Sequence, residues 1–488
     1  MSDSTPAAPA RELPRVLGFT ATLCVIVGSV IGSGIFIVPA RVANEIPAMG
    51  PIGIAWVVGG LFCIAGVLTL AELAAMLPHA GGPYVFLREA YGKLPAFLFG
   101  WAEFWVIRTG SMAALAAAFA MYASQLTGVP AGMPSAVWQA ILAISAMAVV
   151  ATVNVLGTRR GADLQVFGTV LKVGALAAMI VAPFLVGKAE IARWTPVWPE
   201  RVDFGFLQAF MVAMVGVLWA YDGWIHVSSL SEEIEDPARN IPRTLITGGF
   251  ILILIYVSMS LVYHLVMPMN EASALANAPE GGGTAEPIAG VYCKRVVGDW
   301  GGVAIALVVM TSTFIALNGN VLSGPRAYFA LARDGLFPSA LARVHARFQT
   351  PANAIVLQTL WAMALTVVGT ALVVFEPPQT GLPPWAASAW NLLHRTPLYD
   401  VLYTYVIFGG TVIYTLSIAS VFVLRRKRPD LARPYKTWGY PITPAAYILA
   451  ALVLLGSMLA RTPLQSLAGL GILIAGIPAY YLQTRRAS

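Results

Sequence analysis

Charged residues are scarce in this sequence. Asp, Glu, Lys and Arg make up 11% of its 488 residues, whereas hydrophobic residues make up 58%. About a quarter of the residues of a soluble globular protein are charged, so the shortage excludes that class. The apolar residues gather in runs of roughly twenty, each long enough to cross a bilayer as a helix. Because the runs lack the apolar/polar alternation of barrel strands, the sequence predicts an all-α integral membrane protein.

The sequence also has few cysteines and histidines and lacks common catalytic motifs. The three cysteines are Cys24, Cys63 and Cys293, and the first two lie in apolar runs, so no disulfide framework is expected. The five histidines show no metal-ligand spacing, and the sequence contains no HExxH, GxSxG or P-loop pattern. Residues 1–15 are polar and contain no apolar signal-peptide core. We therefore expect no enzyme, metal or cofactor, and a disordered cytoplasmic tail at residues 1–15.

Twelve apolar runs predict twelve transmembrane helices joined by loops too short to fold as a separate soluble domain. The expected spans are 16–43, 52–77, 95–125, 136–156, 164–187, 206–233, 243–267, 299–332, 352–375, 401–425, 441–460 and 464–483.

The distribution of basic residues predicts the orientation. If the N-terminus is cytoplasmic, 20 of the 30 Lys and Arg residues fall on the cytoplasmic side and eight on the other, while Arg108 and Lys172 lie within spans. Basic residues favour cytoplasmic loops. Both termini are therefore expected in the cytoplasm. The same distribution accounts for the net charge of +7 without a nucleic-acid partner.

Two spans contain residues that weaken a helix at membrane depth. The first holds GSVIGSGIFIVP, residues 28–39, and the sixth holds WAYDGW, residues 219–224. Glycine costs about 1 kcal/mol relative to alanine inside a helix. A pair of interrupted helices at matching positions in two halves is typical of inverted-repeat transporters. The sequence thus predicts repeats at 16–190 and 206–426, followed by two further helices within 440–484.

An unwound segment exposes backbone groups that suit a zwitterion. The N-terminus of the second half-helix attracts an anion such as a carboxylate, and the carbonyl ends of the first half-helices attract an ammonium group. Asp222, in the second break, has two interpretations: a ligand for a substrate cation, or a helix cap that accepts from the N–H of Trp224 or Ile225. We favour the cap.

Long motifs surround the two breaks. GSVIGSGIF, followed by LWAYDGWIHVSSLSEEIEDPARNIPRTL, resembles the amino acid–polyamine–organocation (APC) superfamily, and most closely the prokaryotic L-type amino acid transporters (LAT). Further matches lie at 72–92, 317–338 and 424–441. The resemblance implies a five-plus-five inverted-repeat core of the LeuT type with discontinuous helices 1 and 6 and two extra C-terminal helices. It also implies alternating access around a central amino-acid site, in a bacterial inner membrane.

The resemblance assigns substrate-binding roles by motif position. Backbone N–H groups hold the carboxylate, carbonyl groups hold the α-ammonium, and one aromatic side chain closes over the substrate. The N–H groups are those of Gly32, Ser33 and Gly34, the carbonyls are those of Val30, Trp219, Ala220 and Asp222, and the aromatic gate is Trp219.

The resemblance also places Lys172 where sodium-coupled relatives bind a sodium ion, near Ser312 and Thr313. Its ammonium would replace the ion, which predicts sodium-independent transport. Proton coupling through Lys172 and a permanent structural charge both stay open. Glu103 and Arg108 are five residues apart, so we expect them not to share a helix face but to pair with neighbouring helices.

Eukaryotic relatives join a heavy chain through a cysteine in the loop after span three. The corresponding loop here, TGVPAGMPS, has no cysteine, so no disulfide-linked partner is expected. The leading hypothesis is a transporter of neutral L-amino acids, working as an exchanger or proton symporter. The alternatives are a carrier of cationic amino acids or polyamines with the same fold, and a non-transporting amino-acid sensor. Ile225 stands where some relatives have Asn, which leaves the preferred side chain open.

Overall fold

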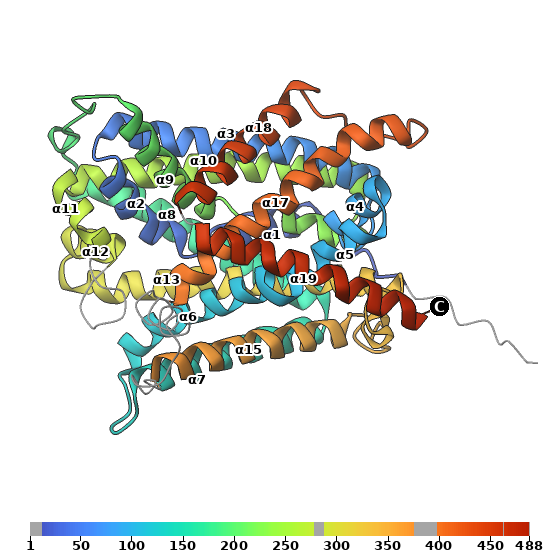
Figure 1. Ribbon diagram of the computed structural model, residues 1–488. Coiled ribbons are helices and arrows are strands. Elements are labelled where there is room, and N and C mark those ends of the chain that lie inside the picture. The colour runs from blue at the N-terminus through green and yellow to red at the C-terminus, as the bar shows by residue number, and fades with distance from the viewer. Residues whose placement is uncertain (1–11, 278–286, 375–397, 462, 488) are drawn as a thin grey trace, which may run out of the picture.

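The computed structural model describes residues 12–277, 287–374, 398–461 and 463–487 (Figure 1). Regular structure within these ranges is helical, apart from an isolated bridge between Leu17 and Ile234. The first eleven residues of the expected tail lie outside the described residues. In chain order the α-helices are α1 (Phe19–Val30), α2 (Gly34–Glu45), α3 (Met49–Met76), α4 (Pro83–Tyr91), α5 (Lys93–Ala102), α6 (Arg108–Thr127), α7 (Ser135–Val155), α8 (Thr158–Leu185), α9 (Phe204–Ala220), α10 (Pro237–Val266), α11 (Met269–Ala274), α12 (Ile288–Val297), α13 (Gly301–Ser323), α14 (Pro325–Arg333), α15 (Ala352–Val374), α17 (Leu398–Lys427), α18 (Ile442–Arg461) and α19 (Pro463–Ala487).

The described helices confirm a multi-pass membrane protein. Eleven are long and apolar enough to span a bilayer, or twelve when the bent pair α1 and α2 counts as one span. Large apolar side chains stand exposed on α8, α10 and α15, such as Phe167, Leu254 and Leu360. In a bilayer these side chains contact lipid, so exposing them carries no hydrophobic cost.

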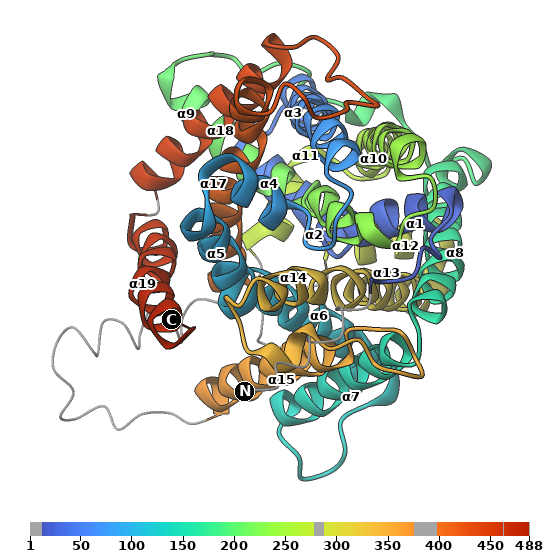
Figure 2. The same ribbon diagram turned by 90° about the vertical axis from the view of Figure 1, so that its right-hand side faces the viewer.

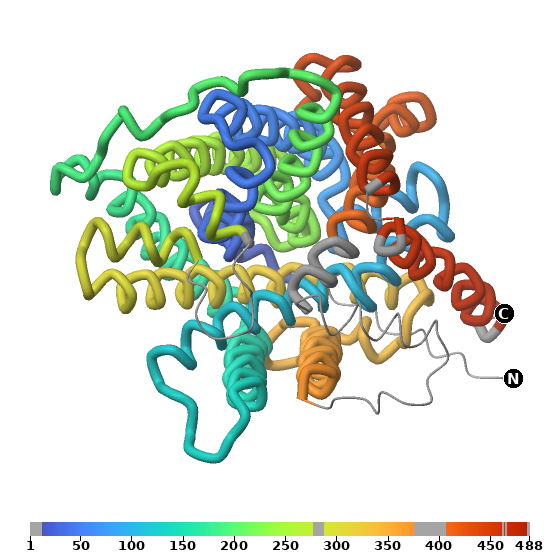
Figure 3. The backbone as a smooth tube through the Cα atoms, turned by 60° about the vertical axis from the view of Figure 1, so that its left-hand side comes forward, coloured from blue at the N-terminus to red at the C-terminus, as the bar shows by residue number. Residues whose placement is uncertain are grey.

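The long helices form two packed groups with α1 and α2 between them. In Figure 1, α3, α9 and α10 lie in the upper half, and α6, α7, α13 and α15 in the lower half. Figure 2 shows α1 and α2 inside the molecule, where α1 packs against α8, α10 and α13. Figure 3 shows the chain after α8, in green, crossing the outside of the molecule before α9 begins. The arrangement buries the first broken helix at the centre of the protein.

Both breaks occur where the sequence predicts them. The first span stops at Val30 and resumes at Gly34, with a bend of 41°. The sixth span stops at Ala220 and continues as a 3₁₀ helix, Trp224–Glu233. Between these halves Gly223 has φ +113°, a backbone angle that favours glycine. The ranges of the two repeats stay a prediction.

The prediction for Glu103 and Arg108 was wrong. We expected Glu103 and Arg108 not to share a helix face, but they form an ion pair of 2.8 Å with both side chains 1% exposed. The reason is a π-helical turn, Glu103–Ile107, between α5 and α6. A π turn closes i to i+5 instead of i to i+4, which brings residues five apart onto one face.

Buried ion pairs close the end of the bundle that carries α4 and α14, on the right of Figure 1. Arg326 donates to Glu233 at 2.6 Å and to the Thr158 hydroxyl at 2.9 Å. Glu232 accepts from Arg333 and from the backbone N–H of Leu13. These bonds join the N-terminal segment and the end of the sixth span to α8 and α14.

Candidate functional site

The two helix breaks lie directly against each other. A Cβ added at Gly34 would come within 3.0 Å of Ala220 Cα, and one added at Gly223 would lie 3.5 Å from Val30 Cα. Each break therefore meets the end of a half-helix from the other span. Only glycine allows the α2 backbone to approach Ala220 this closely without displacing it.

Backbone groups of opposite polarity converge at this junction. The first N–H groups of an α-helix have no carbonyl partner within that helix, and α2 begins at Gly34. The α1 half-helix ends in carbonyls, and the Val30 carbonyl accepts from the Tyr256 hydroxyl at 3.1 Å. The Trp219 carbonyl accepts from the N–H of Asp222 at 3.1 Å. A carbonyl has two lone pairs, so it can accept from more than one donor.

Lys172 occupies the space beside the first break. It is fully buried on α8, and its Nζ donates to the carbonyls of Gly28 and Ile31 at 2.6 Å each and to that of Ser312 at 3.4 Å. The Ser312 hydroxyl donates to the carbonyls of Ile31 and Gly32, at 3.1 and 3.0 Å. Lys172 thus joins α1, α8 and α13, and the Gly28 and Ile31 carbonyls that it binds lie at the end of α1, where carbonyls lack helical partners.

Thr313 is not part of this arrangement. Its hydroxyl donates to the carbonyls of Val309 and Met310, inside its own helix. Ser312 and Thr313 point to different sides of α13 because neighbouring positions on a helix are about 100° apart. Of the two residues that the sequence placed near Lys172, the structure brings only Ser312 to it.

Asp222 lines a small cavity whose wall contains no residue of the first break. The cavity is walled by α3, the second break, α17 and α18, and the Asp222 carboxylate accepts from the N–H of Gly223. The expected cap on Trp224 or Ile225 is absent, since Gly223 holds the N-cap position of the 3₁₀ helix without a side-chain cap. The left-handed turn at Gly223 moves the start of that helix beyond the reach of Asp222.

A buried polar cluster adjoins the second break and was missed by the sequence analysis. The Arg108 Nη2 lies 2.6 Å from the His226 Nδ1, and the Arg108 Nη1 donates to the Asn320 Oδ1 at 3.1 Å. Arg108 also forms the ion pair with Glu103. His226 follows the break by three residues, and Asn320 is on α13. The available signal was an arginine in the middle of an apolar span, which is rarely left unpaired.

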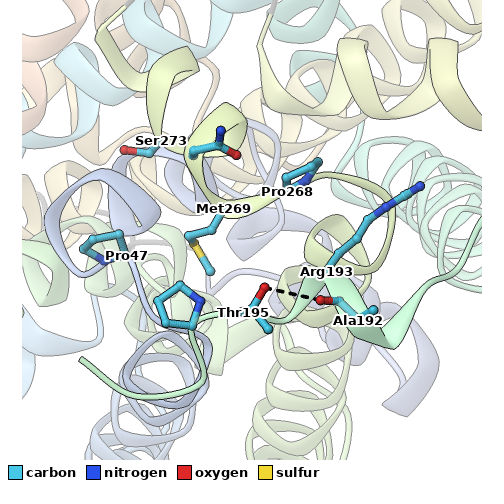
Figure 4. Close-up of a pocket in the computed structure, with 9 residues that line it drawn as sticks. Pro47, Ala192, Arg193, Thr195, Pro268, Met269 and Ser273 are labelled. Carbon is cyan, nitrogen blue, oxygen red and sulfur yellow. Dashed lines mark hydrogen bonds between the residues drawn. The ribbon is translucent and has the colours of Figure 1, made fainter. Parts of the chain in front are cut away.

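A hollow larger than the one beside Asp222 lies away from this junction. It measures about 470 Å³ and lies at the end of the molecule opposite the C-terminus, between the α2 end, the segment before α9 and α11. Figure 4 shows Pro47, Met269 and Ser273 around it, with the Thr195 hydroxyl bonded to the Ala192 carbonyl. The Arg193 guanidinium, its main charged group, already donates to Val266 and Glu190. Neither helix break lines this hollow.

Comparisons with known proteins identify the family of the chain. The model of the amino acid permease family matches residues 17–476. The chain belongs to that family, within the APC superfamily. The serine/threonine exchanger SteT of Bacillus subtilis is 29% identical over 481 residues, which cover 98% of this permease and 98% of the exchanger.

Two human relatives have nearly the same sequence identity to this permease. The b(0,+)-type amino acid transporter 1 is 28% identical over 479 residues, 96% of this permease and 88% of its own chain. The large neutral amino acids transporter small subunit 2 is 28% identical over 491 residues, 99% of this permease and 83% of its own chain. This permease is therefore an amino acid transporter, with a broken first and sixth span in the fold of its superfamily. The roles of the individual site residues stay a prediction.

Proposed function

We propose that this permease carries neutral L-amino acids without sodium, by alternating access, as an exchanger or a proton symporter. The observation that carries the proposal is the meeting of the two breaks, with Lys172 bonded beside them. The N–H groups of Gly32, Ser33 and Gly34 hold the substrate carboxylate. The carbonyls of Val30, Trp219 and Ala220 hold its α-ammonium. A free amino acid presents an anionic and a cationic group close together, which suits a helix N-terminus that lies beside the carbonyl ends of two half-helices.

Sodium independence is supported by the bonds of Lys172. A sodium ion at the first break needs the carbonyl oxygens of the unwound segment as ligands. The Lys172 Nζ already donates to two of these carbonyls at 2.6 Å and so occupies ligands that the ion would need. An added cation there would have to displace these bonds, and it would be repelled by Lys172 whenever that side chain is charged.

A neutral substrate side chain is favoured over a cationic one by the orientation of Asp222. A carrier of cationic amino acids or polyamines needs a carboxylate directed at the substrate side chain. The acids of the buried core are Glu72, Glu103, Glu232 and Glu233, and each pairs with an arginine. Asp222 lines a cavity on the α17 and α18 side of the break.

The names of the relatives support transport over sensing. SteT is named an exchanger, and the human relatives are named transporters. We place both termini in the cytoplasm on the distribution of the basic residues, and we place this permease in the bacterial inner membrane on its resemblance to prokaryotic L-type amino acid transporters. The loop between α6 and α7 contains no cysteine, so we propose that it works without a disulfide-linked partner.

Uptake into proteoliposomes tests the proposal. Purified protein is reconstituted in sodium-free buffer, and entry of labelled L-alanine, L-leucine, L-arginine and putrescine is followed with and without unlabelled amino acid inside. We expect entry of alanine or leucine that sodium does not stimulate. Entry of arginine or putrescine alone would establish the cationic carrier. Saturable binding of an amino acid without any entry would establish the sensor.

A further inference from the structure

Asp222 is an acidic residue at membrane depth without a basic partner among the described residues. The four buried glutamates of the core each pair with an arginine. Arg108 is the arginine whose charge acts on Asp222, but it is bonded to Glu103. An ionised carboxylate inside a membrane is unfavourable unless a cation or proton compensates it. The side chain therefore needs a compensating positive charge that the described protein does not provide.

The cavity beside Asp222 limits what that charge can be. It measures about 30 Å³ and is lined by α3, the second break, α17 and α18. A space of this size holds a water molecule but is far too small for an amino acid or a hydrated metal ion. Most of the wall is aromatic or aliphatic, with Phe62, Trp224 and Leu454 among its residues. A bare metal ion would find far fewer oxygen ligands here than the six or more that hard cations take.

A second polar group in the wall has no partner. The Tyr414 hydroxyl is buried without a hydrogen bond, and the residue is 6% exposed. A Cβ placed at Gly410, another lining residue, would lie 3.8 Å from that hydroxyl, so the hydroxyl end of the ring is at the cavity wall. Leaving a buried hydroxyl unpaired costs about 1–3 kcal/mol, which a water in the cavity would offset.

The other titratable and charged groups around Asp222 do not compensate it. Cys63 of α3 and Tyr447 of α18 line the same cavity and are neutral in their protonated forms. Tyr221 donates its hydroxyl to the Trp56 carbonyl at 3.2 Å. Arg108, Glu103 and His226 form their own bonded cluster on the α6 and α13 side. Asp222 is thus the acid lining this cavity that remains open to an external proton.

We propose that the Asp222 carboxylate, with the Tyr414 hydroxyl and one water, is the binding site for a proton that moves with the substrate. The inference rests on the proposed function and specifies its driving ion. A hydronium ion in the cavity gives one proton to a carboxylate oxygen of Asp222 and remains as water. The O–H bond that forms replaces the one that breaks, and no other reactant takes part.

The position of Asp222 explains how this proton affects substrate binding. Asp222 and Gly223 are the link between the two halves of the sixth span, and the carboxylate holds the Gly223 N–H. Neutralising the carboxylate weakens that charge-assisted bond. The adjacent carbonyls of Trp219 and Ala220 are the ones expected to bind the α-ammonium. Proton binding and substrate binding therefore act on the same turn of backbone.

Proton influx measured together with uptake tests the proposal. Proteoliposomes contain a pH-sensitive dye, and labelled L-alanine or L-leucine is added with and without an inward proton gradient. The variants are Asp222→Asn and Tyr414→Phe. The matched control is Asp203→Asn, an acid at the start of the same span that caps α9 through the N–H of Phe206 at 2.8 Å.

We expect the wild type and Asp203→Asn to acidify the lumen when substrate enters, and the gradient to stimulate their uptake. In Asp222→Asn the gradient stimulation and the substrate-linked acidification disappear together, whatever the absolute rate. Tyr414→Phe retains both and needs a lower pH for half-maximal stimulation, because the hydroxyl no longer helps to hold the proton-donating water.

Two results would overturn the proposal. One is substrate-linked acidification that persists in Asp222→Asn. The other is amino-acid exchange by the wild type with no proton movement, which leaves the transport function intact and removes the proton site. Wild-type protein that transports no amino acid would instead refute the proposed function. If Asp222→Asn moves no substrate, the rise in unfolding temperature that substrate causes is measured at several pH values in the variant and in the wild type. An equal pH dependence in the two proteins would contradict the role of Asp222.

Discussion

The Nζ of Lys172 lies 2.6 Å from the carbonyl oxygen of Ile31, in the gap between the two halves of the first span. A helix that is broken inside a membrane leaves carbonyls that water cannot reach, and each unpaired carbonyl is costly there. Lys172 compensates this cost with charge-assisted bonds from a neighbouring helix. The unwound backbone is therefore held by a side chain and keeps its shape without a bound ion.

The first prediction concerns this side chain. Lys172→Ala leaves the carbonyls of Gly28 and Ile31 without their 2.6 Å donors, so we expect the initial rate of uptake to fall at least about tenfold. Thr169→Val is the control, because Thr169 on the same helix makes one 3.1 Å bond to the Cys24 carbonyl, away from the break. We expect this control to keep a rate within about threefold of the wild type. Equal losses in the two variants would show that Lys172 has no special role.

The second prediction concerns the contact between the two breaks. Gly34→Ala places a Cβ 3.0–3.1 Å from Ala220, against backbone and a methyl group that cannot rotate away. The two broken spans must move apart, and we expect substrate affinity to fall by about tenfold, equivalent to ~1.4 kcal/mol. The variant is compared by concentration-dependent uptake with Gly53→Ala on α3, where an added Cβ meets nothing within 4 Å. Wild-type affinity in Gly34→Ala would contradict a substrate site at this junction.

Much of this architecture follows from the sequence alone, since a bilayer allows few ways to satisfy the backbone. Runs of about twenty apolar residues predict spans, and glycine or aspartate inside a run predicts a break. The first span was expected to break near Gly32 and does so between Val30 and Gly34. Such features depend on local chemistry, which a single sequence contains.

Other features depend on contacts between distant helices, and the sequence could not provide them. The pairing of Glu103 with Arg108 requires a π turn, and no residue type signals that turn. Asp222 lines a cavity beside α17 and α18. This position depends on the backbone angle of Gly223 and on the packing around it. The separate helices α11 and α12 were also not expected before the eighth span.

The third prediction concerns the backbone angle at the second break. Gly223 has φ +113°, and a Cβ there forces strain of about 1–3 kcal/mol. Gly223→Ala should therefore lower both the thermal stability and the uptake rate. Gly174→Ala, in a regular turn of α8 with nothing within 4 Å of the added Cβ, should be neutral or slightly stabilising. Thermal unfolding in detergent and uptake by the same preparations measure both effects, and unchanged stability in Gly223→Ala would refute the strained turn.

The last prediction concerns the buried pair of Glu233 and Arg326, which joins the end of the sixth span to α14. The side chains are 0% and 1% exposed, and the arginine also donates to the Thr158 hydroxyl. Removing one partner leaves the other charge buried and uncompensated, which lowers the free energy of unfolding by about 3–5 kcal/mol. Arg326→Met should thus lower the unfolding temperature strongly.

The exposed pair of Glu190 and Arg193, with side chains 54% and 27% exposed, provides the comparison. Solvent screens such pairs, so Glu190→Gln should change stability by about 1 kcal/mol or less. The double variant Arg326→Met/Glu233→Leu removes both buried charges together and should recover part of the stability lost in Arg326→Met. Recovery would identify the lone Glu233 carboxylate as the main source of the damage, because the apolar pair has no charge left to compensate. A double variant less stable than Arg326→Met would instead show that packing at this position matters more than charge.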